Sequence, residues 1–123
     1  MPTPPVLEDP SYPGRTGGYV ARITGKLLHE AATFGPHRLF LPAPRSATTH
    51  YIYGGPDSSC PPLVQVPHEF YIGLYKRIKG IFGVGAESKF GERIVNYDGR
   101  PYTFRAKHVS SPVRGIDISI VVG

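Results

Sequence analysis

Several ingredients of common protein classes are scarce in this sequence. It has one cysteine, Cys60, no tryptophan, and charged side chains at only 19% of positions. A single cysteine cannot form a disulfide within the chain, which excludes the disulfide framework of a small secreted domain. The segment around it, residues 57–62, brings an acid close to the thiol rather than a cation, so nothing nearby predicts a reactive thiolate.

Long apolar runs are also missing. No run reaches the roughly 20 residues that a membrane-spanning helix needs. The first 13 residues lack the basic and apolar regions of a secretory signal. We therefore expect a chain that is made in the reducing cytoplasm and does not contact a membrane.

Glycine and proline are abundant instead, with 15 and 14 of 123 residues, while 40% of the chain is hydrophobic and 11% aromatic. A disordered chain would be poor in aromatic residues. Each proline inside a helix costs about 3 kcal/mol, so short strands ended by turns fit better than long helices. The composition predicts a mainly β fold, a small antiparallel β-barrel or sandwich that forms one domain over residues 19–123.

The glycines and prolines gather in two segments. Residues 1–18 are rich in proline and predict an extended arm, which needs a neighbouring subunit to hold it. Residues 80–91 contain four glycines and predict a long exposed loop. We expect the apolar side chains of these two segments to contact a subunit or another partner, namely Val6, Leu7, Tyr12, Phe82, Val84 and Phe90.

Alternating apolar residues predict most of the strands. The clearest are residues 92–97 and 101–107, which Asp98-Gly99 joins in the strongest short-range signal for a hairpin. Residues 116–122 predict a closing strand with its isoleucines inward. Further strands are predicted at residues 19–23, 38–41, 50–53 and 63–66.

Two segments fit both a helix and a strand. Residues 24–34 have apolar residues at helical spacing, with Thr24 as a candidate cap. Residues 68–82 carry an amphipathic helical stripe, but they also alternate, and Gly73 and Gly80 would weaken a helix by about 1 kcal/mol each. We favour a strand that begins at Phe70.

The net charge of +5 favours an acidic partner such as a nucleic acid. The basic residues are spread along the chain, which is more typical of a solvated surface. If the chain binds nucleic acid without sequence preference, the candidate contacts are Arg77, Lys79, Arg100, Arg105 and Lys107.

The motifs for catalysis are weak. The five histidines do not show the spacing of a zinc enzyme, although His37 and His50 could converge in space. A metal-free ribonuclease would use His68 or His108 with nearby cations. Neither set is singled out by its spacing, so we expect no enzyme activity, no metal and no cofactor.

The C-terminal third resembles head–tail joining proteins of tailed bacteriophages, the head-closure or stopper proteins of the neck. The resemblance rests on residues 91–104 (GERIVNYDGRPYTF), in which a strand ends in Tyr97-Asp98-Gly99-Arg100 and a second strand starts with a tyrosine. Residues 109–115 look like that family's loop, residues 116–122 like its closing strand, and residues 68–72 like the strand before the hairpin. The resemblance implies a small β-barrel that assembles as a ring in the virion neck.

Two functions therefore remain. The first is a structural virion protein, assembled in the host cytoplasm, that forms a homo-oligomeric ring through its arm and loop, contacts other virion proteins and touches DNA non-specifically. The alternative is a small basic β-barrel that binds nucleic acid.

Overall fold

The computed structural model describes residues 16–35, 37–55, 59–85, 89–110 and 113–122. Two helices and six strands follow one another in a simple order. They are α1 (Thr16–Thr33), β1 (Arg38–Pro42), β2 (Thr49–Tyr53), β3 (Pro62–Pro67), α2 (His68–Phe82), β4 (Phe90–Tyr97), β5 (Arg100–Val109) and β6 (Gly115–Val122).

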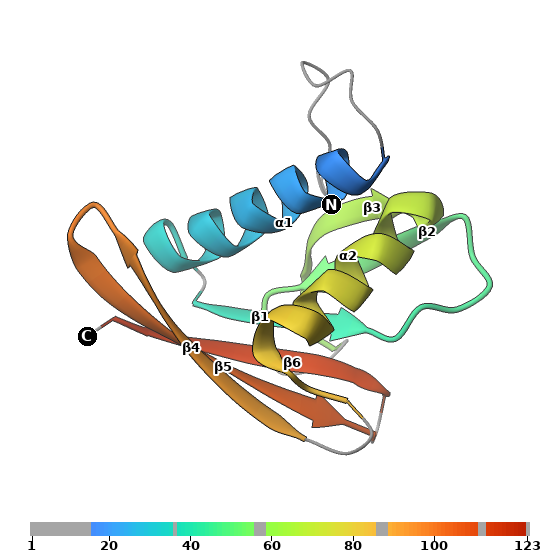
Figure 1. Cartoon of the computed structure of the whole chain (residues 1–123). Coiled ribbons are helices and arrows are strands. Elements are labelled where there is room, and N and C mark those ends of the chain that lie inside the picture. The colour runs from blue at the N-terminus through green and yellow to red at the C-terminus, as the bar shows by residue number, and fades with distance from the viewer. Residues whose placement is uncertain (1–15, 36, 56–58, 86–88, 111–112, 123) are drawn as a thin grey trace.

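The six strands form one antiparallel sheet in the order β3-β2-β1-β6-β5-β4. Both helices lie on the same side of this sheet, as Figure 1 shows. The predicted mainly β, antiparallel fold is confirmed. The sheet is not closed into a barrel; the fold is layered like a sandwich, and the two helices form the layer opposite the sheet.

Helix α1 replaces the strand that the alternation at residues 19–23 predicted, so that prediction is wrong. Its buried residues recur at helical spacing: Val20, Ile23, Thr24, Leu27, Leu28, Ala31 and Ala32. Thr24 is not a cap but lies inside the helix, where its hydroxyl donates to the carbonyl oxygen of Val20 at 2.7 Å. The five-residue alternation was too short to distinguish a strand from the first turns of this helix.

Helix α2 takes the place of the strand that we favoured from Phe70, which is a second correction. Five of its residues are buried on one side, namely Tyr71, Leu74, Tyr75, Ile78 and Phe82. Gly73 lies against α1, where an added Cβ would come within 3.1 Å of Val20 Cγ2. The glycine that seemed to weaken a helix therefore lets two helices approach closely. Gly83 ends α2 in the left-handed conformation, with φ 66°.

The other strand predictions are confirmed. Asp98 and Gly99 both have positive φ, 53° and 79°, as a tight two-residue hairpin turn requires. In β6 the isoleucines point to the helices and are buried, with Ile116 and Ile118 fully enclosed. The strands expected at residues 38–41, 50–53 and 63–66 are β1, β2 and β3.

The boundaries of the two glycine- and proline-rich segments change. The predicted loop at residues 80–91 is shorter, because Gly80 belongs to α2 and Gly91 to β4. The predicted arm ends earlier than residue 18, since α1 begins at Thr16. Residues 1–15 lie outside the described residues.

Gly91 allows β4 to pass the end of α2. An added Cβ there would collide with the carbonyl oxygen of Phe82, which is backbone and cannot swing aside. Gly91→Ala should lower the free energy of unfolding by about 1 to 3 kcal/mol. Gly80→Ala is the matched control, because Gly80 is an exposed helical residue with no atom within 4 Å of the new Cβ. It should raise the free energy of unfolding by up to about 1 kcal/mol. Urea unfolding measures both variants, and equal changes in their free energies of unfolding would contradict the packing argument.

Candidate functional site

The face of the sheet opposite the helices is the most distinctive surface of the molecule. Residues paired across antiparallel strands share a face, so the register places whole rows on it. One row across β4, β5, β6 and β1 is Glu92, Arg105, Ser119 and Arg38. The rows beside it are Phe90, Lys107 and Asp117 on one side and Ile94, Thr103 and Val121 on the other. We call these three rows the open face.

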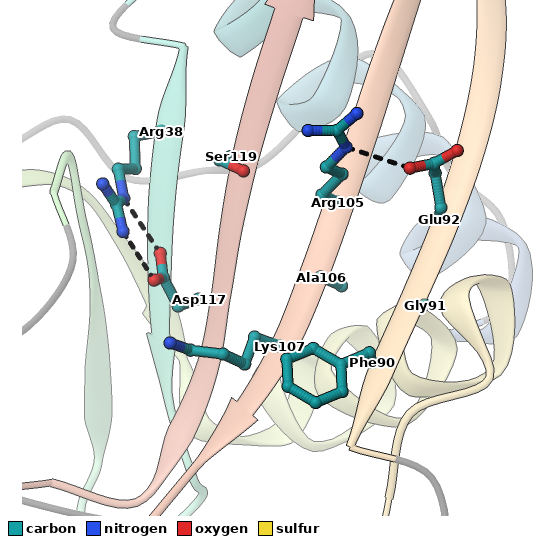
Figure 2. Close-up of a pocket in the computed structure, with 9 residues that line it drawn as sticks. All are labelled: Arg38, Phe90, Gly91, Glu92, Arg105, Ala106, Lys107, Asp117 and Ser119. Atoms are coloured by element: carbon teal, nitrogen blue, oxygen red, sulfur yellow. Dashed lines mark hydrogen bonds and ion pairs between the residues drawn. The ribbon is translucent and has the colours of Figure 1, made fainter.

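The open face mixes exposed apolar side chains with charges. Phe90 is 70% exposed, Ile94 62% and Val121 48%. A hollow of about 450 Å³ lies over the first two rows, whose residues line it. Figure 2 shows Lys107 extending across the hollow from β5 toward β6.

One ion pair in the hollow joins the two central strands. The guanidinium of Arg38 donates to both carboxylate oxygens of Asp117, from Nε at 3.1 Å and from Nη2 at 2.8 Å. The Asp117 side chain is only 9% exposed and that of Arg38 is 44% exposed. The hydrogen bonds to Asp117 raise the pKa of Arg38 further above its usual value. This bidentate geometry is the strongest form of an ion pair in proteins.

The second ion pair lies nearer the edge of the sheet. Arg105 donates from Nε to Oε2 of Glu92 at 2.9 Å, and both side chains are more than half exposed. Figure 2 shows one pair joining β1 to β6 and the other joining β5 to β4. Because each arginine has a carboxylate partner, the hollow is closer to neutral than its three cations, the two arginines and Lys107, would make it. A surface of this kind suits contact with another protein better than capture of an anion.

The predicted interface residues do not meet at one place. Phe90 is on the open face, whereas Phe82 and Val84 are buried in the hydrophobic core. Their side chains are therefore not exposed to a neighbour. Val6, Leu7 and Tyr12 lie outside the described residues.

The candidate nucleic-acid contacts are also divided. Arg105 and Lys107 are on the open face, while Arg77 and Lys79 belong to α2 on the other side of the sheet. Arg100 is at the hairpin turn, where β5 begins. The five cations thus form no single patch.

Among the histidines the structure brings together His50 and His68 rather than His37 and His50. Nε2 of His50 lies 2.8 Å from Nδ1 of His68, and the His50 ring also stacks on Tyr71 with centroids 4.4 Å apart. His37 instead contacts the carbonyl oxygen of Ala32 at the end of α1. The pairing of His50 with His68 had no sequence signal, because the two residues are 18 apart on different elements.

His50 is buried, and its pKa is lowered first by burial and then by the charges of His68 and Arg45. The two histidines proposed for a ribonuclease are His68 and His108. His68 begins α2, whereas His108 is in β5 near Lys79 at the end of α2. The two are therefore not joined in one site. Within the described ranges, no three histidine, cysteine or acidic side chains are grouped as a metal site would need.

Some of the open face could have been found from the sequence. Placing Ile116, Ile118 and Ile120 inward puts Asp117, Ser119 and Val121 outward, because strand residues alternate. The ion pair with Arg38 could not have been found this way, since it depends on β1 lying beside β6.

Comparisons with known proteins gave no match: no family model, no curated protein and no solved structure is similar to this chain. Neither helix of the described residues is long and apolar enough to cross a membrane.

Removing the arginine from each ion pair should have unequal effects. Arg38→Ala leaves a nearly buried Asp117 carboxylate without its partner, which should lower the free energy of unfolding by about 1 to 3 kcal/mol. Arg105→Ala is the matched control and should cost less than about 1 kcal/mol, because Glu92 is exposed to water. If urea unfolding gave the two variants equal losses of the free energy of unfolding, the central pair would contribute no more to stability than the exposed one.

Stability should fall in mild acid because of His50. Its pKa is lower in the folded chain than the usual value of about 6.5 in the unfolded chain. The unfolded chain therefore binds the proton more readily, so stability is full above about pH 6.5 and falls as the pH drops toward the folded pKa. His50→Gln should flatten this slope in unfolding measurements across that range. A slope that stays as steep as in the parent would assign the effect to other groups, such as His108, whose pKa is also lowered.

Proposed function

We propose that the chain is a structural virion protein of a tailed bacteriophage, a neck component that assembles with copies of itself into a ring. The resemblance of residues 91–104 supports the family. These residues form β4, the hairpin turn and the first half of β5. In this proposal the chain performs no chemistry, and its partners are its own copies and other virion proteins.

The observation that carries the assembly is the open face. Its exposed apolar residues, Phe90, Ile94 and Val121, lie on strands whose other side packs against the hydrophobic core. Exposed apolar side chains gathered on one surface indicate a contact site for another protein. The ion pairs beside them can fix the orientation of a partner without leaving strong net charge in the contact.

The two edges of the sheet support a ring over a simple pair. Among the described strands, β3 and β4 are at the two edges of the sheet, and each is hydrogen-bonded to one neighbouring strand. An unpaired edge is a template for a strand of another chain. Since the two edges differ, the β3 edge of one copy can contact the β4 edge of the next. This head-to-tail contact repeats from copy to copy, and the copies form a closed ring when the rotation between neighbours divides a full turn.

A charge placed on the open face should prevent assembly. Ile94→Lys puts an ammonium group among the exposed apolar residues, so the wild type should form a discrete oligomer and this variant a folded monomer. The control is Phe34→Lys, because Phe34 is 83% exposed but follows α1, away from the open face. Light scattering during size-exclusion chromatography measures the mass of each, and circular dichroism checks folding.

The same measurement addresses the N-terminal segment. A chain without residues 2–15 keeps all of α1, and it should remain folded but assemble less well. If Ile94→Lys assembled as well as the wild type, the open face would not be the contact through which the copies assemble. Mass spectrometry of purified particles of the phage that encodes the chain tests the virion role. If the chain were absent from the particles, the proposal would be wrong.

A further inference from the structure

One corner of the sheet gathers basic residues from four separate segments. Lys79 belongs to α2, Lys89 directly precedes β4, His108 is near the end of β5, and Arg114 directly precedes β6. The strand register brings these segments together, because Phe90 pairs with Lys107 and Val109 pairs with Gly115. Figure 1 shows β5 ending and β6 beginning at the same end of the sheet. We call these four residues the basic corner.

Backbone and ring contacts hold the basic corner in place. The backbone N–H of His108 donates to the carbonyl oxygen of Lys89 at 2.8 Å, and the carbonyl oxygen of Arg114 accepts from Ala43 at 2.8 Å. The ammonium of Lys79 lies 5.9 Å from the centre of the Tyr75 ring, a cation–π distance. The cations therefore start from fixed backbone positions, although they are far apart in sequence.

The basic corner differs from the open face in that no carboxylate of the described residues pairs with its cations. Arg38 and Arg105 are paired with carboxylates, whereas Lys79, Lys89 and Arg114 form no ion pair with any carboxylate that the structure describes. Burial lowers the pKa of His108, and Arg114, Lys79 and Lys89 lower it further. Each of these three cations lowers the pKa of His108, which indicates a local excess of positive charge.

We propose that the basic corner binds the phosphate groups of a nucleic acid. Lysine and arginine that lack acidic neighbours gain most from a phosphate, and releasing counterions from a polyanion drives such binding without sequence preference. A whole-chain charge of +5 adds long-range attraction to a polyanion. Of the five contacts that the sequence suggested, only Lys79 belongs to this set.

The proposal goes beyond assembly and does not depend on it, because the basic corner is complete within one chain. It also predicts a role for His108. A bound phosphate would favour the protonated imidazole, so binding should tighten as the pH falls through the range in which histidine titrates, near 6.5 and below.

The direct test is fluorescence anisotropy with labelled random-sequence DNA, single-stranded and duplex, over a series of salt concentrations. The triple variant K79Q/K89Q/R114Q should bind far more weakly than wild type. Its slope of log affinity against log salt on duplex DNA should fall by about 2.7 if each cation contacts one phosphate, at about 0.9 per contact. The matched control K26Q/K76Q/R77Q removes the same charge from exposed helix positions and should change the slope little.

The outcomes separate the alternatives. Equal losses in the two triple variants, or no binding by wild type at low salt, would overturn the proposal. Competition by polyglutamate as strong as by DNA would assign the basic corner to an acidic protein instead. His108→Gln should bind at neutral pH but lose the tightening in acid, and retention of that tightening would remove His108 from the site. Ile94→Lys is expected to be monomeric and still to bind DNA. A failure of the assembly proposal can therefore be distinguished from a failure of the DNA-binding proposal.

Discussion

The pairing of β1 with β6 holds the two halves of this fold together. Strands β1, β2 and β3 form one meander and β4, β5 and β6 another, and among the described strands this central pair joins them into one sheet. Leu39 and Leu41 of β1 lie beside Ile118 and Ile116 of β6, and all four are fully buried beneath the helices. Gly115 is required at the end of the pair, because a Cβ there would press on the backbone of Leu41.

The same pairing shapes both faces of the sheet at its centre. On the helix side it completes the core that α1 and α2 cover. On the other side it brings Arg38, which pairs with Ser119 in the register, within reach of Asp117 in the next row, 79 residues away in the chain, and so neutralises the centre of the open face. The loop that leads into β6 then carries Arg114 to the basic corner. The β1–β6 pairing thus shapes the centre of the open face, while the pairings of β4 with β5 and of β5 with β6 bring together three residues of the basic corner, Lys89, His108 and Arg114.

A contact between proteins and a contact with a polyanion need different surfaces, and this small chain offers one of each. The open face has exposed apolar residues, and two of its three cations are paired with carboxylates, which suits a protein partner. The cations of the basic corner form no ion pair with a carboxylate in the part of the chain that the structure describes, which suits phosphate. Because they lie on different parts of the sheet, a copy bound through its open face would keep the basic corner free for a nucleic acid.

The sequence by itself determined the elements whose signals are local. The hairpin at Asp98 and Gly99 follows from two residues that tolerate positive φ, and the strands β1, β2, β3 and β6 follow from alternation. The same alternation implied that Asp117 faces away from the core. These features depend on neighbours within a few residues, so no knowledge of the rest of the chain was needed.

Tertiary structure decided the rest. Residues 16–33 and 68–82 are helices because their apolar sides pack on the sheet and on each other, with Gly73 against Val20, and this packing outweighs the cost of glycine in a helix. The His50–His68 contact, the Arg38–Asp117 pair and the basic corner each join segments distant in sequence. Their geometry follows from strand order and register, and a pattern of residues along one chain does not contain that information.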